Sequence, residues 1–429
     1  MSLSPSPAAS LQRVHHLLGQ PTDLEGHLDA HGPLNVALGR SSSWQHGLVA
    51  SLEESGLTGR GGGAFPTSVK LAVSQSGGQG GIIVVNAMEG EPASSKDQLL
   101  LTRAPHLVLD GAQYLATLCG SDRVTICLPN GRVAVVAAVR HALQERRAHR
   151  YARVREEIAQ PPDRFIAGEE SALVNWLESA RSAPVFRPDK SIPLRIKKRP
   201  ALVHNAETLA HIALIARYGA GPFRARGMAE EPGTCLVTLS GAVTHSGVVE
   251  VDKGTPLWDI AQRGQPIEPI QALLVGGYGG AWVGPAHFRT PYASIPLRTI
   301  GATAGVGVIV ALGETSCGLA ESARIAHYLA GESSGQCGPC AFGLPAIADD
   351  LARLVSGRSD NGLLARLERR LRHVNGRGAC RHPDGAVALV RSALSVFASD
   401  VAAHSRGTPC PFWRKPTLLR FPRPIGLGR

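Results

Sequence analysis

Short apolar runs alternate with helical segments through the first half of this chain of 429 residues. Residues 82–85 and 124–128 have the composition of strands, and the segments 106–119 and 132–148 carry apolar residues at helical spacing. A further strand is expected near 165–167. Parallel strands need a crossover long enough to hold a helix, so this alternation predicts a parallel α/β sheet.

The chain changes character after residue 233. Over 234–300, short β-type runs are separated by Gly and Pro, which predicts a small second domain built mostly of strands. Residues 319–355 and 360–404 are rich in Ala and Leu at helical spacing and predict a compact helical domain. We therefore expect five parts: a loose N-terminal segment (1–45), an α/β domain (46–233), a stranded domain (234–310), a helical domain (311–404) and a basic Pro-rich tail (405–429).

Composition narrows the class of protein. Hydrophobic residues make up 43% of the chain, enough for a sizeable core. The 49 Gly and 30 Pro residues, with only 5% aromatics, favour a turn-rich α/β protein over a coiled coil. The longest apolar runs fall short of the roughly 20 residues that span a bilayer, and the first residues lack a signal-peptide pattern. We expect a cytoplasmic protein without a transmembrane segment.

The net charge of +11 is unevenly spread, because residues 405–429 hold six basic residues and no acidic ones. We expect a solvated, extended tail there. Nucleic-acid binding is an alternative, with Phe412, Trp413 and Phe421 as stacking surfaces. The density of prolines and the absence of a nucleic-acid motif argue against it.

A glycine-rich turn at residues 59–63 leads through Phe65 into a helix that carries Lys70. Glycines let a backbone approach a ligand closely, and the free N–H groups of a helix N-terminus attract phosphate. The turn is flanked by Arg60 as well as Lys70, so it is a candidate phosphate site. It matches neither a P-loop nor a dinucleotide-binding fingerprint, and a plain turn remains an alternative.

Polar residues also follow the predicted strands. Asn86, Glu89, Glu91, Lys96 and Asp97 follow the first strand, and the run 168–170 (Gly-Glu-Glu) follows a later one. Ligands of α/β proteins bind beyond the carboxyl ends of the strands. We expect these loops and the glycine-rich turn to converge on one crevice, although a solvated loop remains an alternative for each.

Eight cysteines in a cytoplasmic chain argue against a disulfide framework. Four are scattered in apolar surroundings and are expected to be buried: Cys119, Cys127, Cys235 and Cys317. Cys337 and Cys340 form a C-x-x-C pair, and Cys380 lies downstream. Three thiolates fall one short of the four ligands of zinc or of a cubane cluster. A metal or cluster site, a redox dithiol and a structural role all stay open.

Five ordered motifs resemble the F subunit of bacterial NADH–quinone oxidoreductase and the related diaphorase subunits of hydrogenases and formate dehydrogenases. They cover most of residues 50–400 and comprise 56–67 with Lys70, 86–97, 168–170, 203–209, and 332–340 with Cys380.

The resemblance implies an FMN-binding α/β domain, a β-grasp domain of the soluble-ligand-binding type near 235–300, and a C-terminal helical domain with a [4Fe–4S] cluster. It implies that FMN phosphate rests on the glycine-rich turn, that Lys70 and two Asn contact the flavin, and that Phe65 and two Glu contact NADH. The implied cofactor-binding residues are Gly59, Arg60, Gly61, Gly62, Gly63, Phe65, Lys70, Asn86, Glu89, Gly168, Glu169, His204 and Asn205. The implied catalytic residues are Glu91 and Glu170, and the implied cluster ligands are Cys337, Cys340, Cys380 and Ser334.

By the same resemblance, the chain is an NAD(P)H dehydrogenase in which NADH reduces FMN and single electrons pass to the cluster. The electrons would leave to a separate protein, ferredoxin-like or another dehydrogenase subunit. Such partners are usually acidic, which suits the positive net charge. The protein would be cytoplasmic, either free or peripheral to a membrane complex.

The chain departs from the family at several positions. Met88 stands where the family usually has Asp, Phe165 where it has Tyr, His204 at the second position of a Val-Asn-Asn motif, and Arg187 where it has Lys. Ser334 replaces the first cysteine of C-x-x-C-x-x-C, and an alkoxide is a harder ligand than a thiolate. Three outcomes stay open: a cluster whose fourth iron binds Ser334 or water, a three-iron cluster, or no cluster. A non-catalytic scaffold that keeps the fold is the alternative function.

Overall fold

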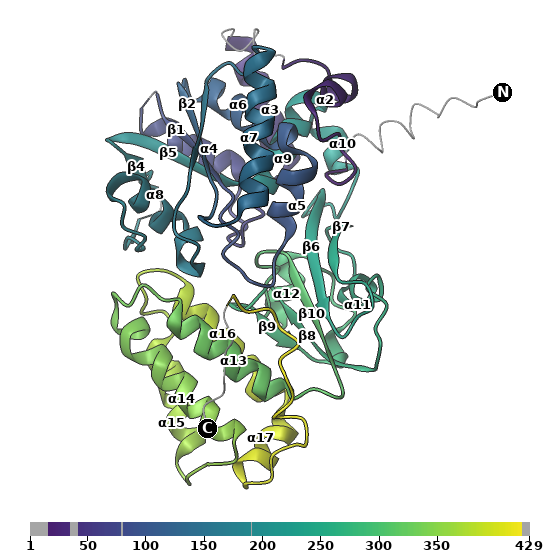
Figure 1. Cartoon of the computed structure of the whole chain (residues 1–429), viewed down its shortest axis with the longest axis vertical. Coiled ribbons are helices and arrows are strands. Elements are labelled where there is room, and N and C mark those ends of the chain that lie inside the picture. Colours follow the sequence, from purple (N-terminus) through teal and green to yellow (C-terminus); the bar gives the residue numbers. More distant parts are fainter. Residues whose placement is uncertain (1–15, 35–41, 79, 190, 423–429) are drawn as a thin grey trace, which may run out of the picture.

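The computed structural model describes residues 16–34, 42–78, 80–189 and 191–422. A helix-covered sheet forms one end of the molecule, a second sheet lies beside and below it, and a group of helices forms the other end (Figure 1). The three parts meet near the middle of the molecule.

The first sheet has the strand order β3-β2-β1-β5-β4. Its strands are β1 (Ile82–Asn86), β2 (Arg123–Cys127), β3 (Arg155–Ala159), β4 (Arg195–Ile196) and β5 (Arg199–Asn205). All pairs are parallel except the antiparallel edge pair β4–β5. The predicted parallel α/β sheet is therefore confirmed apart from this edge.

Helices from the crossovers, and from the segments before β1 and after β5, cover this sheet. They are α3 (Ser42–Ser55), α4 (Thr67–Ser76), α5 (Lys96–Arg103), α6 (Pro105–Leu118), α7 (Val133–Ala148), α8 (Glu170–Ser179), α9 (Ala206–Tyr218) and α10 (Ala220–Arg224). Helix α6 is buried along nearly its whole length and packs against α9. A Cβ added at Gly111 would lie 1.9 Å from the carbonyl oxygen of Leu209, so only glycine allows this approach.

The strand expected near 165–167 is wrong, because Phe165–Gly168 is a 3₁₀ helix, η2. The strand of this region is β3, whose sequence Arg-Glu-Glu-Ile-Ala lacks an apolar pattern. Its inward-facing residue Glu156 is buried as an ion pair with Arg146, with Nε and Oε1 3.1 Å apart. The strand could not be recognised from the sequence, because a buried ion pair takes the place of the apolar side chains that usually mark a buried strand.

The expectation of a loose segment over 1–45 is wrong for the part that is described. Helix α2 (Leu24–His31) is capped by the Asp23 side chain, and Leu17, Leu24 and Leu34 join the core of the first sheet. His27 is fully buried, with its Nε2 2.9 Å from Oδ2 of Asp110 on α6. Residues 1–15 and 35–41 lie outside the described residues.

The second sheet is mixed, with the order β7-β6-β10-β8-β9. Its strands are β6 (Thr234–Gly241), β7 (Gly247–Asp252), β8 (Ile270–Val275), β9 (Ala281–Val283) and β10 (Val308–Gly313). Strand β10 runs parallel to β6 and antiparallel to β8. The connections hold α11 (Leu257–Gln262), η3 (Pro285–His287) and α12 (Ser294–Thr299).

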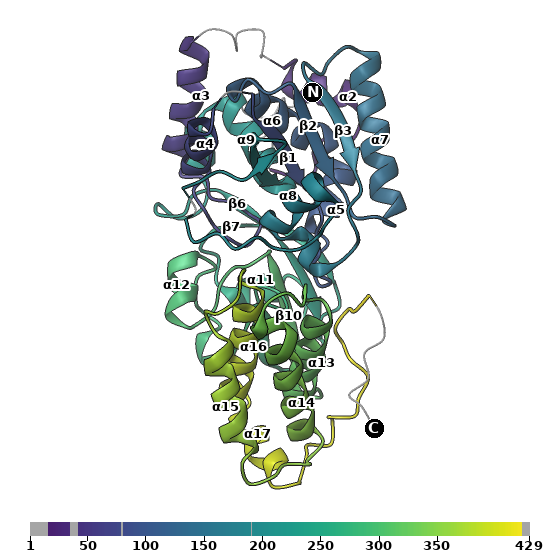
Figure 2. The same ribbon diagram turned by 90° about the vertical axis from the view of Figure 1, so that its left-hand side faces the viewer.

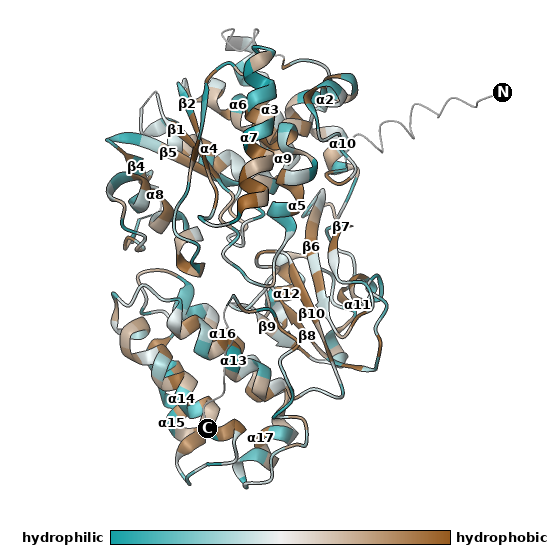
Figure 3. Cartoon of the chain, viewed as in Figure 1, coloured by the Kyte–Doolittle hydropathy of each residue, from teal (hydrophilic) through white to brown (hydrophobic). Residues whose placement is uncertain are grey.

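Both faces of this second sheet are buried. Alternate residues of β10 face opposite cores, with Val308 and Val310 packed toward the helical part and Ile309 and Ala311 toward α11 and α12. Figure 3 shows the resulting apolar stretches along the strands. The sheet thus joins the helical part to the rest of the molecule through an apolar interface.

The helical part comprises α13 (Gly318–Gly331), the π-helical turn η4 (Pro339–Gly343), α14 (Leu344–Val355), α15 (Leu363–Val374), α16 (His382–Val396) and α17 (Ala398–Ser405). In the described chain, none of the individual helices has the length and apolarity to cross a membrane. Taken together, α16 and α17 meet those criteria, but they meet at a bend of 85°.

The expected solvated tail is wrong for residues 406–422, which run back along the helical part (Figure 2). Leu419 is buried, and Phe421 packs against Tyr278 and Tyr328. The hydroxyl of Thr417 donates to Oε2 of Glu321 at 2.6 Å. Aromatic and leucine side chains between the prolines supply this contact, while residues 423–429 lie outside the described part.

Candidate functional site

A cavity of about 530 Å³ opens where the two sheets and the helical part meet. This volume lies within the range of cofactor and ligand sites. Its lining comes from the carboxyl ends of β1 and β5, the glycine-rich turn, η2, the loops at the edge of the second sheet and the start of α16. We call it the central cavity.

The structure brings the three predicted loops together at the central cavity. The residues expected at a cofactor site that line it are Gly61, Gly62, Asn86, Glu89, Glu91, Gly168, Glu169 and Asn205. The polar pattern after the strands was therefore sufficient to locate most of the crevice.

Glu89 holds the loop after β1 against helix α5. Its carboxylate accepts hydrogen bonds from the backbone N–H groups of Asp97 (2.9 Å) and Gln98 (3.0 Å) and from the Ser94 hydroxyl (2.7 Å). Burial raises the pKa of this carboxyl, and the charge of Asp97 adds to the effect. Glu89 thus satisfies the free N–H groups at the start of α5 and fixes the loop.

Glu91 lies at the junction of the two sheets. Its Oε1 accepts from the N–H of Ala93 (3.2 Å) and its Oε2 from the N–H of Tyr278 (2.9 Å). Burial raises the pKa of Glu91 to about 7, despite these two hydrogen bonds. A carboxyl that changes protonation near neutral pH inside a cavity is suited to hold or release a proton there.

A glycine makes the approach to Glu91 possible. Gly277 has φ of +93°, and a Cβ at this position would lie 2.6 Å from Oε2 of Glu91. Any other residue would meet both backbone strain and a clash.

Two asparagines at the strand ends are anchored by hydrogen bonds. The side-chain amide of Asn86 donates to the carbonyl of Gly168 at 2.9 Å, which ties β1 to η2. Asn205 caps α9, since its Oδ1 accepts from the Thr208 N–H (3.0 Å) and hydroxyl (2.6 Å). Their positions are set before any ligand binds.

Lys96 provides a buried cation beside the central cavity. Its Nζ lies 2.7 Å from Oδ1 of Asp97 and 2.9 Å from Oε2 of Glu207. Burial alone would lower the pKa of Lys96, but the two carboxylates outweigh it and raise the pKa. The ammonium therefore stays charged and links α5 to α9 at the wall of the central cavity.

A second cavity of about 450 Å³ adjoins the first and shares Glu169, Arg381 and Asp384 with it. Four more of the expected site residues line it, together with one of the motif cysteines: Gly63, Phe65, Lys70, Glu170 and Cys380. We call it the outer cavity.

Lys70 does not reach the central cavity in this structure. Its Nζ donates to the carbonyl of Val203 (2.5 Å) and pairs with Oε2 of Glu170 (3.0 Å). Glu169, by contrast, caps α8 by accepting from the N–H of Ala172 at 2.9 Å. The two neighbouring glutamates therefore differ in function, since Glu169 orients a helix and Glu170 neutralises a cation.

Two of the expected cofactor-binding side chains lie elsewhere. The Arg60 guanidinium turns toward the carbonyls of Pro232 (3.4 Å) and Thr234 (3.1 Å), beside a smaller cavity of about 160 Å³ that Gly59 also lines. His204 is buried inside the first sheet, where burial and then the charge of Lys70 lower its pKa well below the usual value. For these two residues, the position in the sequence motif did not reveal where the side chain points.

The motif cysteines come from two loops: Cys380 lines the outer cavity, and Cys337 and Cys340 lie just before and within η4. The thiols of Cys337 and Cys340 are within hydrogen-bonding reach, and burial, followed by the effect of Cys337, raises the pKa of Cys340 to about 12. Burial likewise raises the pKa of Cys380 to about 11, with Cys337 among its charged neighbours. Ser334 is half-buried in the same loop. The possible donors are thus three thiols and the Ser334 hydroxyl, and in the described part of the chain the three sulfurs do not all lie within 4.8 Å of one another.

The α/β part holds this loop directly. The Arg164 guanidinium donates to the carbonyls of Gly331 (3.1 Å) and Ser333 (3.3 Å), and Glu332 accepts from the N–H of Phe165 at 2.9 Å. These contacts fix the cysteine loop relative to the central cavity.

Several lining residues were missed at the level of sequence. They come from the second sheet and the helical part: Gly276, Gly279, Gly280, Thr303, Val306, Arg381, His382 and Asp384. The run Gly-Gly-Tyr-Gly-Gly at 276–280 was a usable signal, because such a run lets a backbone approach a ligand or another loop.

Comparisons with known proteins agree with this arrangement. Residues 52–214 match the Nuo51 FMN-binding domain, and residues 320–404 match the NADH-ubiquinone oxidoreductase-F iron-sulfur binding region. The chain is 28% identical to the F 2 subunit of NADH-quinone oxidoreductase in Rhizobium meliloti over 379 residues, which cover 85% of this chain and 90% of that protein. It is 28% identical to the F subunit of NADH-quinone oxidoreductase in Escherichia coli, covering 83% of this chain and 84% of that protein.

A solved structure supports the same relationship. A chain of an NAD⁺-reducing [NiFe]-hydrogenase in the H₂-reduced state superposes with a TM-score of 0.78 at 27% identity, covering 89% of this chain and 67% of that one. The two matched regions flank the second sheet in the sequence of this chain. Over most of its length the chain is therefore similar to the F subunits of NADH–quinone oxidoreductases.

Proposed function

We propose that this protein is an FMN-dependent NAD(P)H dehydrogenase subunit that takes in electrons from a reduced nicotinamide and passes them through an iron–sulfur centre to a separate protein. The observation that carries the proposal is the central cavity, since the glycine-rich turn, the loop after β1 and η2 meet there beside the start of α16.

The central cavity fits a flavin mononucleotide in size and in the chemistry of its lining. Gly61 and Gly62 offer backbone without side chains, and Asn86 and Asn205 are fixed amides at the strand ends. When bound, FMN would accept a hydride and release single electrons. The side chains of this chain would orient the flavin, exclude water from it and, at Glu91, hold a proton near neutral pH.

The outer cavity is the proposed site for the nicotinamide dinucleotide. Phe65 is partly exposed at its edge and offers a surface for ring stacking. The Lys70–Glu170 pair is only half-buried, so either partner is free to exchange for a polar group of the ligand. Because the two cavities share Glu169, Arg381 and Asp384, a dinucleotide in one would border a flavin in the other.

The thiols of Cys337, Cys340 and Cys380 fit an iron–sulfur centre as a soft donor set. We propose that they bind three irons of a cluster, with Ser334 or water at a fourth iron where one is present. The family-typical C-x-x-C-x-x-C run thus survives in all but its first position.

The proposal also assigns a role to each domain and a class of electron acceptor. Residues 46–233, 234–310 and 311–404 would act as the flavin, β-grasp and cluster domains, with the mixed second sheet supporting the middle assignment. The electron acceptor would be an acidic partner protein, ferredoxin-like or another dehydrogenase subunit, bound in the cytoplasm to this positively charged chain.

The test is anaerobic spectroscopy of the full chain with a matched pair of variants. Gly61→Val fills the central cavity, since even a Cβ there lies 3.5 Å from that of Asn205. Gly247→Val adds the same bulk where nothing lies within 4 Å. We expect the wild type and Gly247→Val to hold FMN and to bleach on addition of NADH, and Gly61→Val to fold without FMN.

Protein loaded with FMN that stays oxidised in excess NADH would refute the dehydrogenase. Ser334 and the buried Met88 favour one competing function, a scaffold that keeps the fold without the cofactors. Absence of both flavin and iron from anaerobically purified protein would establish it, whereas stoichiometric FMN would exclude it.

A further inference from the structure

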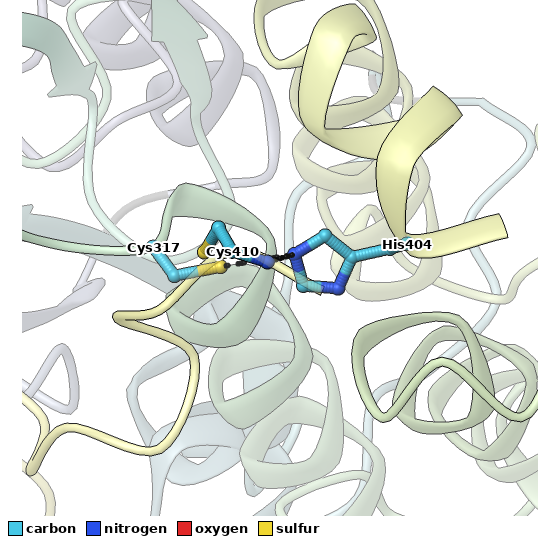
Figure 4. A group of neighbouring side chains, drawn as sticks. All are labelled: Cys317, His404 and Cys410. Atoms are coloured by element: carbon cyan, nitrogen blue, oxygen red, sulfur yellow. Dashed lines mark hydrogen bonds between the residues drawn. The ribbon is translucent and has the colours of Figure 1, made fainter. Parts of the chain in front are cut away.

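Two thiols and an imidazole, none of them from the cysteine motif, meet in the helical part (Figure 4). Cys317 stands at the N-terminus of α13, His404 lies in the last turn of α17, and Cys410 lies in the segment that follows. Their ligand atoms all lie within 4.8 Å of one another. Throughout the described residues, this is the one place where three such side chains converge so closely.

The imidazole is oriented for coordination. The Nδ1 of His404 lies 2.8 Å from the carbonyl of Val355, to which only an N–H can donate, so the lone pair lies on Nε2. The backbone N–H of Cys410 donates to Nε2 at 3.1 Å, which requires the same tautomer. A carbonyl partner on the far nitrogen is the usual arrangement of a metal-binding histidine.

The spacing of the donors suits a tetrahedral ion. Zinc–sulfur bonds of about 2.3 Å and zinc–nitrogen bonds of about 2.0 Å place neighbouring donors of a tetrahedral site roughly 3.5–3.8 Å apart. The Sγ of Cys317 lies 3.9 Å from Nε2 of His404. Cys317 and His404 are therefore close to the spacing of a bound ion, which would take the Nε2 lone pair in place of the N–H of Cys410.

The surroundings favour a bound ion over chance proximity. His404 is fully buried and Cys317 is 3% exposed, while Cys410 is half-buried and leaves an approach from solvent. Burial raises the pKa of Cys317, and the N–H of Ala320, which donates to its Sγ at 3.4 Å at the positive end of α13, acts against that effect.

We propose that Cys317, His404 and Cys410 bind a thiophilic divalent cation of the Zn²⁺ class, with the remaining position open to water. On binding, each thiol gives up its proton to solvent and the cation takes its place, without any change of oxidation state. The site is separate from the motif cysteines and independent of the dehydrogenase proposal.

The cation would fasten the C-terminal segment to the helical part. Cys410 precedes the stretch that reaches Glu321 through Thr417 and Tyr278 through Phe421. Holding this segment at Cys410 shortens the free chain, which lowers the entropy cost of ordering the contacts that follow.

The test is metal analysis of the full chain, purified anaerobically and offered Zn²⁺ after its iron–sulfur centre has been restored. We expect one zinc per chain in addition to the iron. Cys410→Ser should weaken zinc binding by more than about 100-fold, because removal of a ligand exceeds the loss of an outer-shell partner, and should leave the iron content unchanged. As the matched control, Cys337→Ser should lose iron and keep the zinc.

A second measurement follows the segment itself. Trypsin should cleave after Arg414 faster once a chelator has removed the zinc, and the chelator should not change the rate in Cys410→Ser. The proposal is overturned if the wild type takes up no zinc beyond the motif cysteines, or if Cys410→Ser holds as much as the wild type. Isolation of the protein mainly as a Cys317–Cys410 disulfide would overturn it too.

Discussion

Glu91→Gln should remove a pH-dependent loss of stability that the wild type carries. An unfolded glutamate loses its proton near pH 4.5, whereas burial holds the pKa of folded Glu91 at about 7. Between these values the folded chain binds more protons than the unfolded chain, so the free energy of unfolding falls as the pH rises. A pKa difference of about 2.5 corresponds to about 3 kcal/mol, and the loss is complete above pH 7.

The assay is denaturant unfolding of the cofactor-free protein from pH 4.5 to 8. The introduced glutamine retains an acceptor for one of the two N–H groups that Glu91 bonds and places an amide donor against the other, so the variant should start less stable by about 1–2 kcal/mol. The wild type should then lose about 3 kcal/mol relative to the variant as the pH rises. Glu53→Gln, an exposed change on α3, is the control and should follow the wild type. Parallel curves for wild type and Glu91→Gln would refute the assignment of a buried, proton-holding carboxyl.

Three further changes test the rest of the site. Gly277→Ala should lower the free energy of unfolding by about 1–3 kcal/mol and weaken FMN retention, because the φ of +93° at Gly277 and the adjacent Glu91 carboxylate both oppose a Cβ. Gly247→Ala, where nothing lies within 4 Å of the added Cβ, should leave the stability nearly unchanged. Equal losses of stability in the two variants would contradict the reasoning. Lys96→Met should cost about 3–5 kcal/mol by leaving two buried carboxylates unpaired, and a chemical denaturation midpoint at the wild-type value would show that the pair is dispensable. Ser334→Cys should raise the iron bound per chain and change the electron paramagnetic resonance signal of the reduced centre, and an unchanged iron content would place Ser334 outside the ligand set.

The sequence predicted the parallel sheet because its central strands are apolar and its crossovers are helical. It did not reveal β3, where Glu156 is buried against Arg146 in place of an apolar contact. It also assigned a strand to residues 165–167, since three apolar residues before a glycine suit a strand and a 3₁₀ turn equally. Local patterns record burial of apolar side chains, and both errors fall where burial depends on a distant polar partner or on a turn.

The predictions for the two ends of the chain were wrong for a related reason. Residues 16–34 and 406–422 look polar or proline-rich, yet His27 is buried against Asp110 and Leu419 is buried among the helices. Each end gains its order from elements far away in sequence. The composition of a segment does not reveal the distant surface against which the segment packs.

At the site, the sequence placed loops better than it placed side chains. A loop is located by the strand that precedes it, but the direction of a side chain depends on which neighbour accepts its hydrogen bonds. Arg60 illustrates this, because the carbonyls of Pro232 and Thr234 on the approach to β6 draw its guanidinium away from the central cavity. No pattern within residues 56–67 encodes the position of those carbonyls.

The arrangement of the two cavities also explains why the cysteine loop belongs to the site and not merely to the same chain. Cys380 lines the outer cavity, and the next residue, Arg381, lines both cavities. The loop before the other cysteines is held by Arg164, which directly precedes the cavity-lining residue Phe165. A cluster bound there would border the outer cavity through Cys380 and the central cavity through Arg381. Mutations that loosen the Arg164 contacts should therefore slow electron transfer from flavin to cluster while leaving the reduction of the flavin by NADH intact.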